Sequence, residues 1–198
     1  MENNRVNYAL FDLDGTLCDY VGELERGLRL LKSPEERDFD ITKVHEDLPE
    51  YIYERKKLIT QSKEWWANLP KLQLGWDILK VAEKLGYKIS ILSQGPDKNP
   101  NAWAGKKEWQ NKYLDGYEID ITRDKSRVYG RVLVDDFPDY ASAWLAHRPR
   151  GLVIMPENKG NKNFTHPQLI RYNGQNLEEI TRAMEKAKLD NNNIYNAC

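Results

Sequence analysis

Short hydrophobic runs alternate with helical patterns along most of the chain, which predicts an α/β protein whose parallel sheet is covered by helices on both faces. The apolar runs that indicate strands cover residues 8–12, 87–93, 118–122, 131–135 and 151–155. Apolar positions recur at helical spacing over residues 76–85, 102–114, 140–146 and 177–189. Gly86 is expected to end the first of these helices, and Asn176 to begin the last.

Residues 18–70 interrupt this alternation. They contain no strand-like run, only charged helical patterns over residues 21–31 and 48–59, and they end in Trp65-Trp66-Ala-Asn-Leu-Pro. We therefore expect a small helical cap inserted after the first strand, on a core formed by residues 1–17 and 71–189. The Asn-rich tail, residues 190–198, is expected to be flexible because little in it can pack.

Composition narrows the class of protein. Hydrophobic residues make up 40% of the 198 positions, which is enough for one core and a small insertion. Thirty basic and 31 acidic side chains nearly cancel, which argues against an extended nucleic-acid surface. The sequence has no signal peptide and no membrane-spanning segment, so we expect a soluble, cytoplasmic protein without membrane contact. Cys18 and Cys198 form neither a disulfide framework nor a zinc motif.

The first strand is followed directly by a motif with two carboxylates, Asp12 and Asp14, and then Gly15. The carboxyl ends of parallel strands are the usual ligand site of open α/β sheets. Because unpaired buried carboxylates are costly, a divalent cation is expected beside them, and oxygen ligands suit Mg²⁺. An acidic turn or a weak cation site is the alternative interpretation of this motif alone.

Polar side chains also follow the other strands. Ser93 and Gln94 close the second strand, Lys125 lies between the third and fourth, and Asp135-Asp136 follows the fourth. Hydroxyl and backbone N–H groups at such positions can hold phosphate oxygens. Alone, Asp135-Asp136 is typical of a solvated turn, Ser93 of a hydrogen-bonding residue at a strand end, and Lys125 of a solvated charge. The combination predicts one shared site.

These motifs resemble those of the haloacid dehalogenase superfamily of phosphotransferases. The matching residues are Asp12 and Asp14 for its first motif, Ser93 for the second, Lys125 for the third and Asp135-Asp136 for the fourth. The resemblance covers about residues 6–155 and implies a Rossmann-like core with a helical cap after the first strand. Within the superfamily the chain looks most like the 5'(3')-deoxyribonucleotidases, on the segments 65–70, 105–109 and 122–136.

The resemblance implies a phosphomonoesterase that forms a covalent aspartyl-phosphate. Asp12 would be the nucleophile, and Asp14 the proton donor and acceptor. Mg²⁺ would be held by Asp12, the backbone carbonyl of Asp14 and Asp135, with Asp136 in an outer position. The implied phosphate-binding residues are Ser93, Gln94 and Lys125.

The implied substrate is a nucleoside monophosphate, with deoxynucleotides favoured. Trp65 or Trp66 is the candidate for stacking on the base, and packing inside the cap is the alternative role for both. Another small phosphomonoester, a nucleic-acid 3'-phosphate and a non-catalytic nucleotide-binding regulator remain open. The base, the sugar, the position of the phosphate and a possible homodimer are not decided by the sequence.

Overall fold

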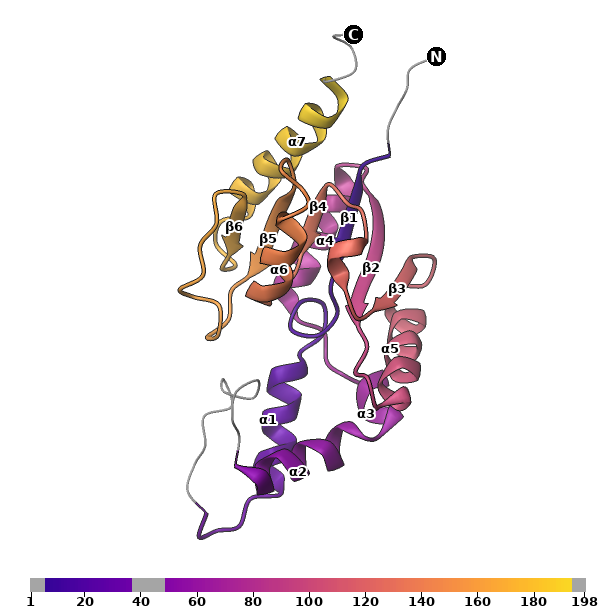
Figure 1. Cartoon of the computed structure of the whole chain (residues 1–198), viewed down its shortest axis with the longest axis vertical. Coiled ribbons are helices and arrows are strands. Elements are labelled where there is room, and N and C mark those ends of the chain that lie inside the picture. The colour runs from indigo at the N-terminus through magenta and orange to yellow at the C-terminus, as the bar shows by residue number, and fades with distance from the viewer. Residues whose placement is uncertain (1–5, 37–48, 194–198) are drawn as a thin grey trace.

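The computed structural model describes residues 6–36 and 49–193, which form a six-stranded parallel sheet with helices on both faces (Figure 1). The strands lie in the order β3-β2-β1-β4-β5-β6, and each neighbouring pair is parallel. The strands are β1 Tyr8–Phe11, β2 Lys88–Gln94, β3 Glu118–Thr122, β4 Val132–Val134, β5 Leu152–Pro156 and β6 Leu169–Tyr172. The helices are α1 Tyr20–Leu30, α2 Glu50–Thr60, α3 Lys63–Ala67, α4 Gln73–Lys84, α5 Pro100–Tyr113, α6 Pro138–Leu145 and α7 Leu177–Asn193, with a 3-10 turn, η2, at Lys125–Arg127. The α/β class expected from the sequence is confirmed.

Five strands lie where the apolar runs predicted them, but β6 was not predicted. It has four residues, lies at the edge of the sheet and is only partly buried over its first three positions. Its sequence also includes Arg171. An edge strand of this kind lacks the continuous apolar run that marks strands buried on both faces, as β4 is.

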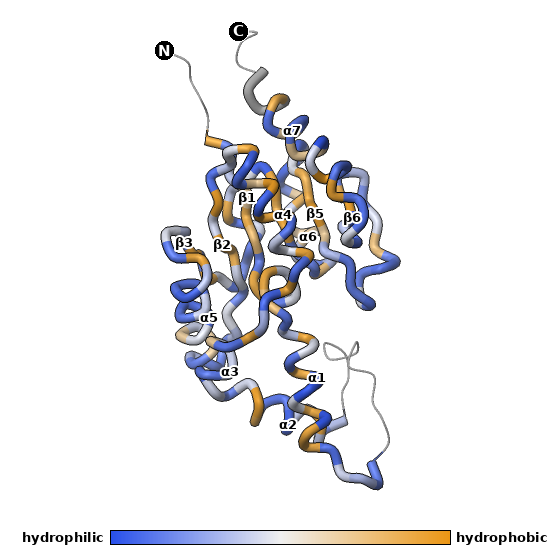
Figure 2. Tube along the Cα trace, turned by 180° about the vertical axis from the view of Figure 1, so that it is seen from behind, coloured by the Kyte–Doolittle hydropathy of each residue, from blue (hydrophilic) through white to orange (hydrophobic). Residues whose placement is uncertain are grey.

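Alternate residues of the strands build two hydrophobic cores. Ala9 and Phe11 of β1 belong to the cluster that includes α4 and α7, whereas Leu10 belongs to the cluster with α6. Hydrophobic residues are accordingly concentrated in the strands (Figure 2). Gly86 ends α4 with a φ of 68°, as expected for a glycine after a helix. None of the helices in the described ranges is both long enough and apolar enough to span a lipid bilayer.

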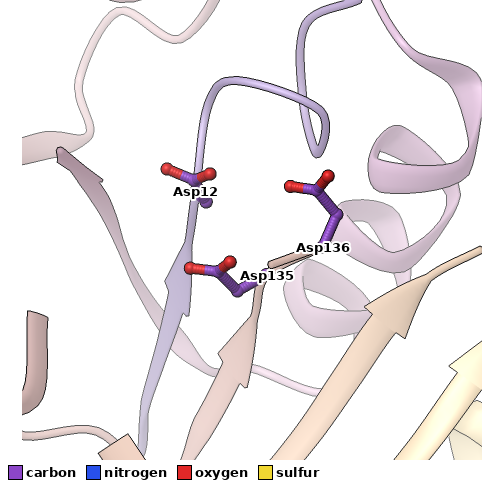
Figure 3. Close-up of side chains that lie close together, drawn as sticks. All are labelled: Asp12, Asp135 and Asp136. Carbon is purple, nitrogen blue, oxygen red and sulfur yellow. The ribbon is translucent and has the colours of Figure 1, made fainter. Parts of the chain in front are cut away.

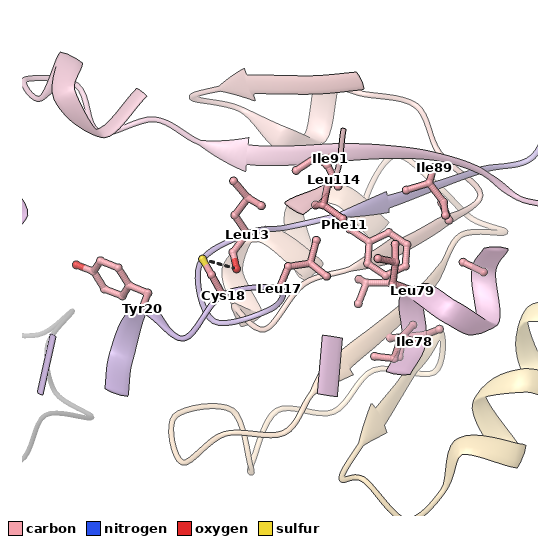
Figure 4. Close-up of a cluster of buried hydrophobic side chains, with 14 of the residues drawn as sticks. Phe11, Leu13, Leu17, Cys18, Tyr20, Ile78, Leu79, Ile89, Ile91 and Leu114 are labelled. Carbon is pink, nitrogen blue, oxygen red and sulfur yellow. Dashed lines mark hydrogen bonds between the residues drawn. The ribbon is translucent and has the colours of Figure 1, made fainter. Parts of the chain in front are cut away.

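The loop after β1 is anchored in the larger core. The side chains of Leu13, Leu17 and Cys18 are buried beneath it, and the Cys18 thiol donates to the Leu13 carbonyl at 3.2 Å (Figure 4). The backbone amides of Leu17 and Cys18 donate to the same carbonyl, at 2.9 and 2.8 Å. This tight turn fixes the backbone on either side of Leu13, where Asp12 and Asp14 stand.

Helices α1, α2 and α3, which we call the helical segment, lie beyond the carboxyl ends of the strands (Figure 1). Asp19 caps the start of α1, and Ser62 caps the start of α3. Helix α3 packs against α5, which connects the segment to the core. Residues 37–48 and the tail residues 194–198, with Cys198, lie outside the described residues. The division into core, cap and tail remains a prediction, although α7 continues past the expected end at residue 189.

Candidate active site

Three carboxylates meet where β1 and β4 end. Asp12 follows β1 and Asp135 follows β4, and these strands pair with Phe11 opposite Val134. Because the strands are parallel neighbours, both side chains reach the same edge of the sheet. One carboxylate oxygen each from Asp12, Asp135 and Asp136 lies within 4.8 Å of the others (Figure 3). We call these three residues the carboxylate cluster.

Lys125 joins two members of the carboxylate cluster. Its Nζ atom lies 2.7 Å from Asp12 Oδ1 and 2.7 Å from Asp135 Oδ2. The lysine is 2% exposed and stands in the 3-10 turn η2, whose start is capped by Asp124. Burial alone would lower the pKa of Lys125, but the two carboxylates raise it above its usual value. Lys125 is therefore a cation at any ordinary pH.

Asp136 is held by the loop between β5 and β6 and packs against the loop after β1. Asn158 Nδ2 donates to Asp136 Oδ2 at 2.8 Å, and the buried Asn161 donates to the backbone carbonyl of Asp136 at 2.9 Å. Gly15 has a φ of 80°, and a Cβ atom there would overlap the Asp136 carboxylate. A glycine is thus needed at this position for both its conformation and its size.

A second group of polar residues lies where β2 ends, beside Asp14. Lys106 of α5 places its Nζ atom 2.6 Å from Asp14 Oδ2, 3.0 Å from Ser93 Oγ and 2.5 Å from the Gln94 carbonyl. Lys106 is 2% exposed and Ser93 is fully buried, whereas Gln94 reaches the surface of the adjoining cavity. Ser93 was expected to bind phosphate, but in the structure Lys106 covers its hydroxyl. The sequence analysis did not select Lys106.

The site holds more negative than positive charge. Its four carboxylates, on Asp12, Asp14, Asp135 and Asp136, are accompanied by the two ammonium groups of Lys106 and Lys125, which leaves these six residues with a net charge of −2 when all are ionised. Burial raises the pKa of Asp135 to about 6, with Lys125 opposing the rise and Asp12 adding to it. Burial and the neighbouring Asp135 raise the pKa of Asp136 well above its usual value. Burial also raises the pKa of Asp14, although Lys106 opposes that rise. A divalent cation would cancel this net charge, and clustered carboxylate oxygens are the donors that hard cations prefer, so the residues present fit such an ion.

A cavity of about 800 Å³ opens above these groups, between the sheet edge and the helical segment. Its floor includes Asp12, Asp14 and Lys125. Basic side chains elsewhere on its wall are Lys56, Lys57, Lys98 and Arg123. Aromatic side chains on its wall are Tyr20, Tyr53, Trp66, Phe137 and Tyr140.

The two adjacent tryptophans have different places. Trp66 lines the cavity and stacks on Tyr20, with ring centroids 5.4 Å apart and planes at 25°. Trp65 is half-buried and does not line the cavity; it packs edge-on against the rings of Tyr20 and Trp66. Of the two candidates for stacking on a substrate, the structure therefore brings Trp66, together with Tyr20, to the cavity.

Comparison with known proteins identifies the fold. No protein-family model matches the sequence, and no curated protein matches it. Solved structures do match. A haloacid dehalogenase-like hydrolase from Burkholderia xenovorans LB400 has a TM-score of 0.53 at 14% identity, covering 93% of this chain and 99% of its own. The fold is that of the haloacid dehalogenase hydrolases.

Two further hydrolases of this fold were solved with ions bound. One, from Deinococcus radiodurans R1 with bound phosphate and sodium, has a TM-score of 0.50 at 15% identity, covering 94% of this chain and 98% of its own. The other, YfnB from Bacillus subtilis bound to magnesium, has a TM-score of 0.50 at 11% identity, covering 90% and 98%. At these identities the likeness concerns the fold.

Proposed function

We propose that the protein is a Mg²⁺-dependent phosphomonoesterase of the haloacid dehalogenase superfamily, with Asp12 as its nucleophile. The observation that carries this proposal is the bridge from Lys125 Nζ to Asp12 and Asp135, 2.7 Å to each, on the floor of a cavity large enough for a small ligand. A buried carboxylate whose orientation is fixed by a lysine, at the bottom of an open cavity, is placed for attack on a substrate.

Asp12 would attack phosphorus and form an aspartyl-phosphate, which splits hydrolysis into two steps. Lys125 binds the Asp12 carboxylate and, with Gln94, lines the cavity, so both would face the phosphate oxygens of a substrate, whereas the Ser93 hydroxyl is fully buried. Asp14 would protonate the leaving oxygen and then take a proton from the water that releases phosphate. Mg²⁺ held by Asp12, Asp135 and the backbone carbonyl of Asp14, with Asp136 in an outer position, would supply the positive charge that lets two anions approach each other.

The proposed substrate is a nucleoside monophosphate, with deoxynucleotides favoured by the resemblance of the sequence to deoxyribonucleotidases. Tyr20 and Trp66 stack on each other and are only 9% and 3% exposed, but both contribute to the cavity wall, which supports an apolar, planar substrate group. Basic side chains on the same wall support an anionic substrate.

A panel of phosphomonoesters assayed with Mg²⁺ tests the proposal. Deoxynucleoside monophosphates are expected to give a higher kcat/KM than ribonucleotides, sugar phosphates, phenyl phosphate or a 3'-phosphorylated oligonucleotide. EDTA and Asp12→Asn should each abolish turnover, and acid quenching should trap phosphate on Asp12. The matched control is Asp139→Asn, on the exposed part of α6.

Each alternative predicts a different outcome of that panel. Preference for a sugar phosphate or for the oligonucleotide would replace the proposed substrate but keep the chemistry. Nucleotide binding without turnover under any divalent metal would identify a regulator instead of an enzyme.

A further inference from the structure

Lys106 occupies a position that the proposed mechanism leaves unexplained. It is a buried lysine on α5, with Ala102 and Trp109 on the same buried side of the helix. An ammonium group has three protons to donate, and Nζ has three acceptors within reach: Asp14 Oδ2, Ser93 Oγ and the Gln94 carbonyl. Lys106 thus ties the carboxyl end of β2 to the loop that follows β1.

We propose that Lys106 is a positioning residue for proton transfer: it holds Asp14 so that Oδ1 faces the leaving group of the substrate. This inference rests on the proposed function. Nζ binds Oδ2 at 2.6 Å, and the neighbour of Oδ1 is the Cys18 thiol at 3.7 Å, which is a weak donor. Oδ1 is therefore the oxygen left to exchange a proton with the substrate.

The proton balance follows from this assignment. As the bond between Asp12 and phosphorus forms, the bond from phosphorus to the leaving oxygen breaks, and that oxygen takes the proton from Asp14 Oδ1. In the second step, Asp14 Oδ1 takes a proton from the attacking water, whose oxygen bonds to phosphorus as the bond to Asp12 breaks. Lys106 keeps its own protons throughout.

Packing keeps Lys106 in place. The adjacent Gly105 lets α5 approach α3 so closely that a Cβ atom there would overlap the Lys63 carbonyl and Trp66 Cβ. An ion pair of 2.6 Å between Lys63 and Glu108 joins the same two helices. The Lys106 ammonium group lies 5.2 Å from the centroid of the Trp66 ring. The side chain is thus confined between the helical segment and the sheet edge.

The test compares substrates whose leaving groups differ in their need for a proton. An aryl phosphate such as p-nitrophenyl phosphate releases a stable phenolate, whereas a nucleoside monophosphate releases an alkoxide that must be protonated. Lys106→Met keeps the length of the side chain and removes its charge. We expect kcat/KM to fall about 100-fold or more for the nucleotide. For the aryl phosphate, the factor by which kcat/KM falls should be at least about ten times smaller. The matched control is Lys107→Met, whose exposed side chain bonds to Gln110.

An equal fractional loss on both substrates would overturn the proposal, because a purely structural role does not distinguish leaving groups. So would an unchanged kcat/KM for the nucleotide. If wild-type protein hydrolyses none of the phosphomonoesters, the proposed function fails instead.

A second variant keeps the test decisive if Lys106→Met does not fold. The double variant Asp14→Asn, Lys106→Met removes both partners, which is tolerated better than removing one. If Lys106 acts through Asp14, the double variant should be within about twofold of Asp14→Asn alone in kcat/KM for the nucleotide, because residues that act as a unit are not additive. A further loss of tenfold or more would show that Lys106 acts independently and would overturn the proposal.

Discussion

The edge of the sheet and the helical segment form the two walls of one cavity, but different interactions hold them in place. At the sheet edge, Asp12 and Asp135 are at most 4% exposed and are fixed by strand pairing and a buried lysine. In the helical segment, α2 buries only Ile52 among its described residues, and Leu58 is 65% exposed. The comparison teaches that the residues proposed to react stand on the sheet edge, which we call the rigid wall, whereas α2 in the opposite wall is more exposed.

The largest expected effect comes from removing the positive charge of Lys125 from the rigid wall. Lys125→Met leaves Asp12 and Asp135 buried together without their shared partner, which should cost about 3–5 kcal/mol in the free energy of unfolding. We also expect kcat to fall by about 100- to 1,000-fold, as when one preorganised donor is removed. Urea unfolding and steady-state kinetics measure the two effects. Lys80→Met, on the exposed side of α4, is the control.

Added Mg²⁺ sharpens this test. Because Mg²⁺ would bind the same carboxylates as Lys125, saturating Mg²⁺ should recover part of the stability lost in Lys125→Met. A loss of stability that is unaffected by Mg²⁺ would contradict the idea that lysine and metal share these ligands.

The second effect is a pH dependence that only the metal-free protein should show. The pKa of Asp135 is raised in the folded state to about 6, so its contribution to stability is complete below the unfolded pKa of 3.8 and is lost as the pH rises through about 6. A rise of this size corresponds to roughly 3 kcal/mol. Asp136, whose pKa is also raised, adds to the loss. Urea unfolding in EDTA should therefore show stability falling between about pH 4 and pH 7, and Mg²⁺ should remove the fall.

Asp136→Asn isolates one part of that pH dependence. The neutral amide should make the metal-free protein more stable than wild type at pH 7, while weakening its affinity for Mg²⁺. Asp139→Asn is the matched control. If the stability of the wild-type protein in EDTA rose with pH instead, the ionised carboxylates would be stabilised without a metal, and the predicted pH dependence would be wrong.

The sequence predicted the rigid wall well, because its residues follow strands and strand ends meet at one edge. The structure brings Asp12, Lys125 and Asp135 together as the strand order required. Lys106 was missed because it stands in the middle of a helix and not in a loop after a strand, although a lysine on the buried face of a helix was a visible signal. Asn158 was missed because the sequence of a polar loop does not indicate which residue its side chains contact in the folded protein.

The helical segment was harder to predict, since side-chain direction there depends on packing between short helices. Two adjacent tryptophans must diverge on a helix, but the sequence does not say which one faces the ligand. Tyr20 was not selected at all, although it directly follows the residue that caps α1. Its stacking on Trp66 depends on how α1 and α3 meet, which no local pattern encodes.

The smallest expected effect tests the wall formed by the helical segment, with two neighbouring variants. Trp66→Leu removes a ring from the cavity, whereas Trp65→Leu removes a ring that does not line it. We expect Trp66→Leu to raise KM for a nucleoside monophosphate by about threefold to tenfold, which is about 1 kcal/mol of aromatic contact, and to leave KM for phenyl phosphate nearly unchanged. Trp65→Leu should change the two KM values by the same factor, because it acts through packing alone. Equal changes in both KM values for Trp66→Leu would mean that its ring packs the helical segment and does not select the substrate.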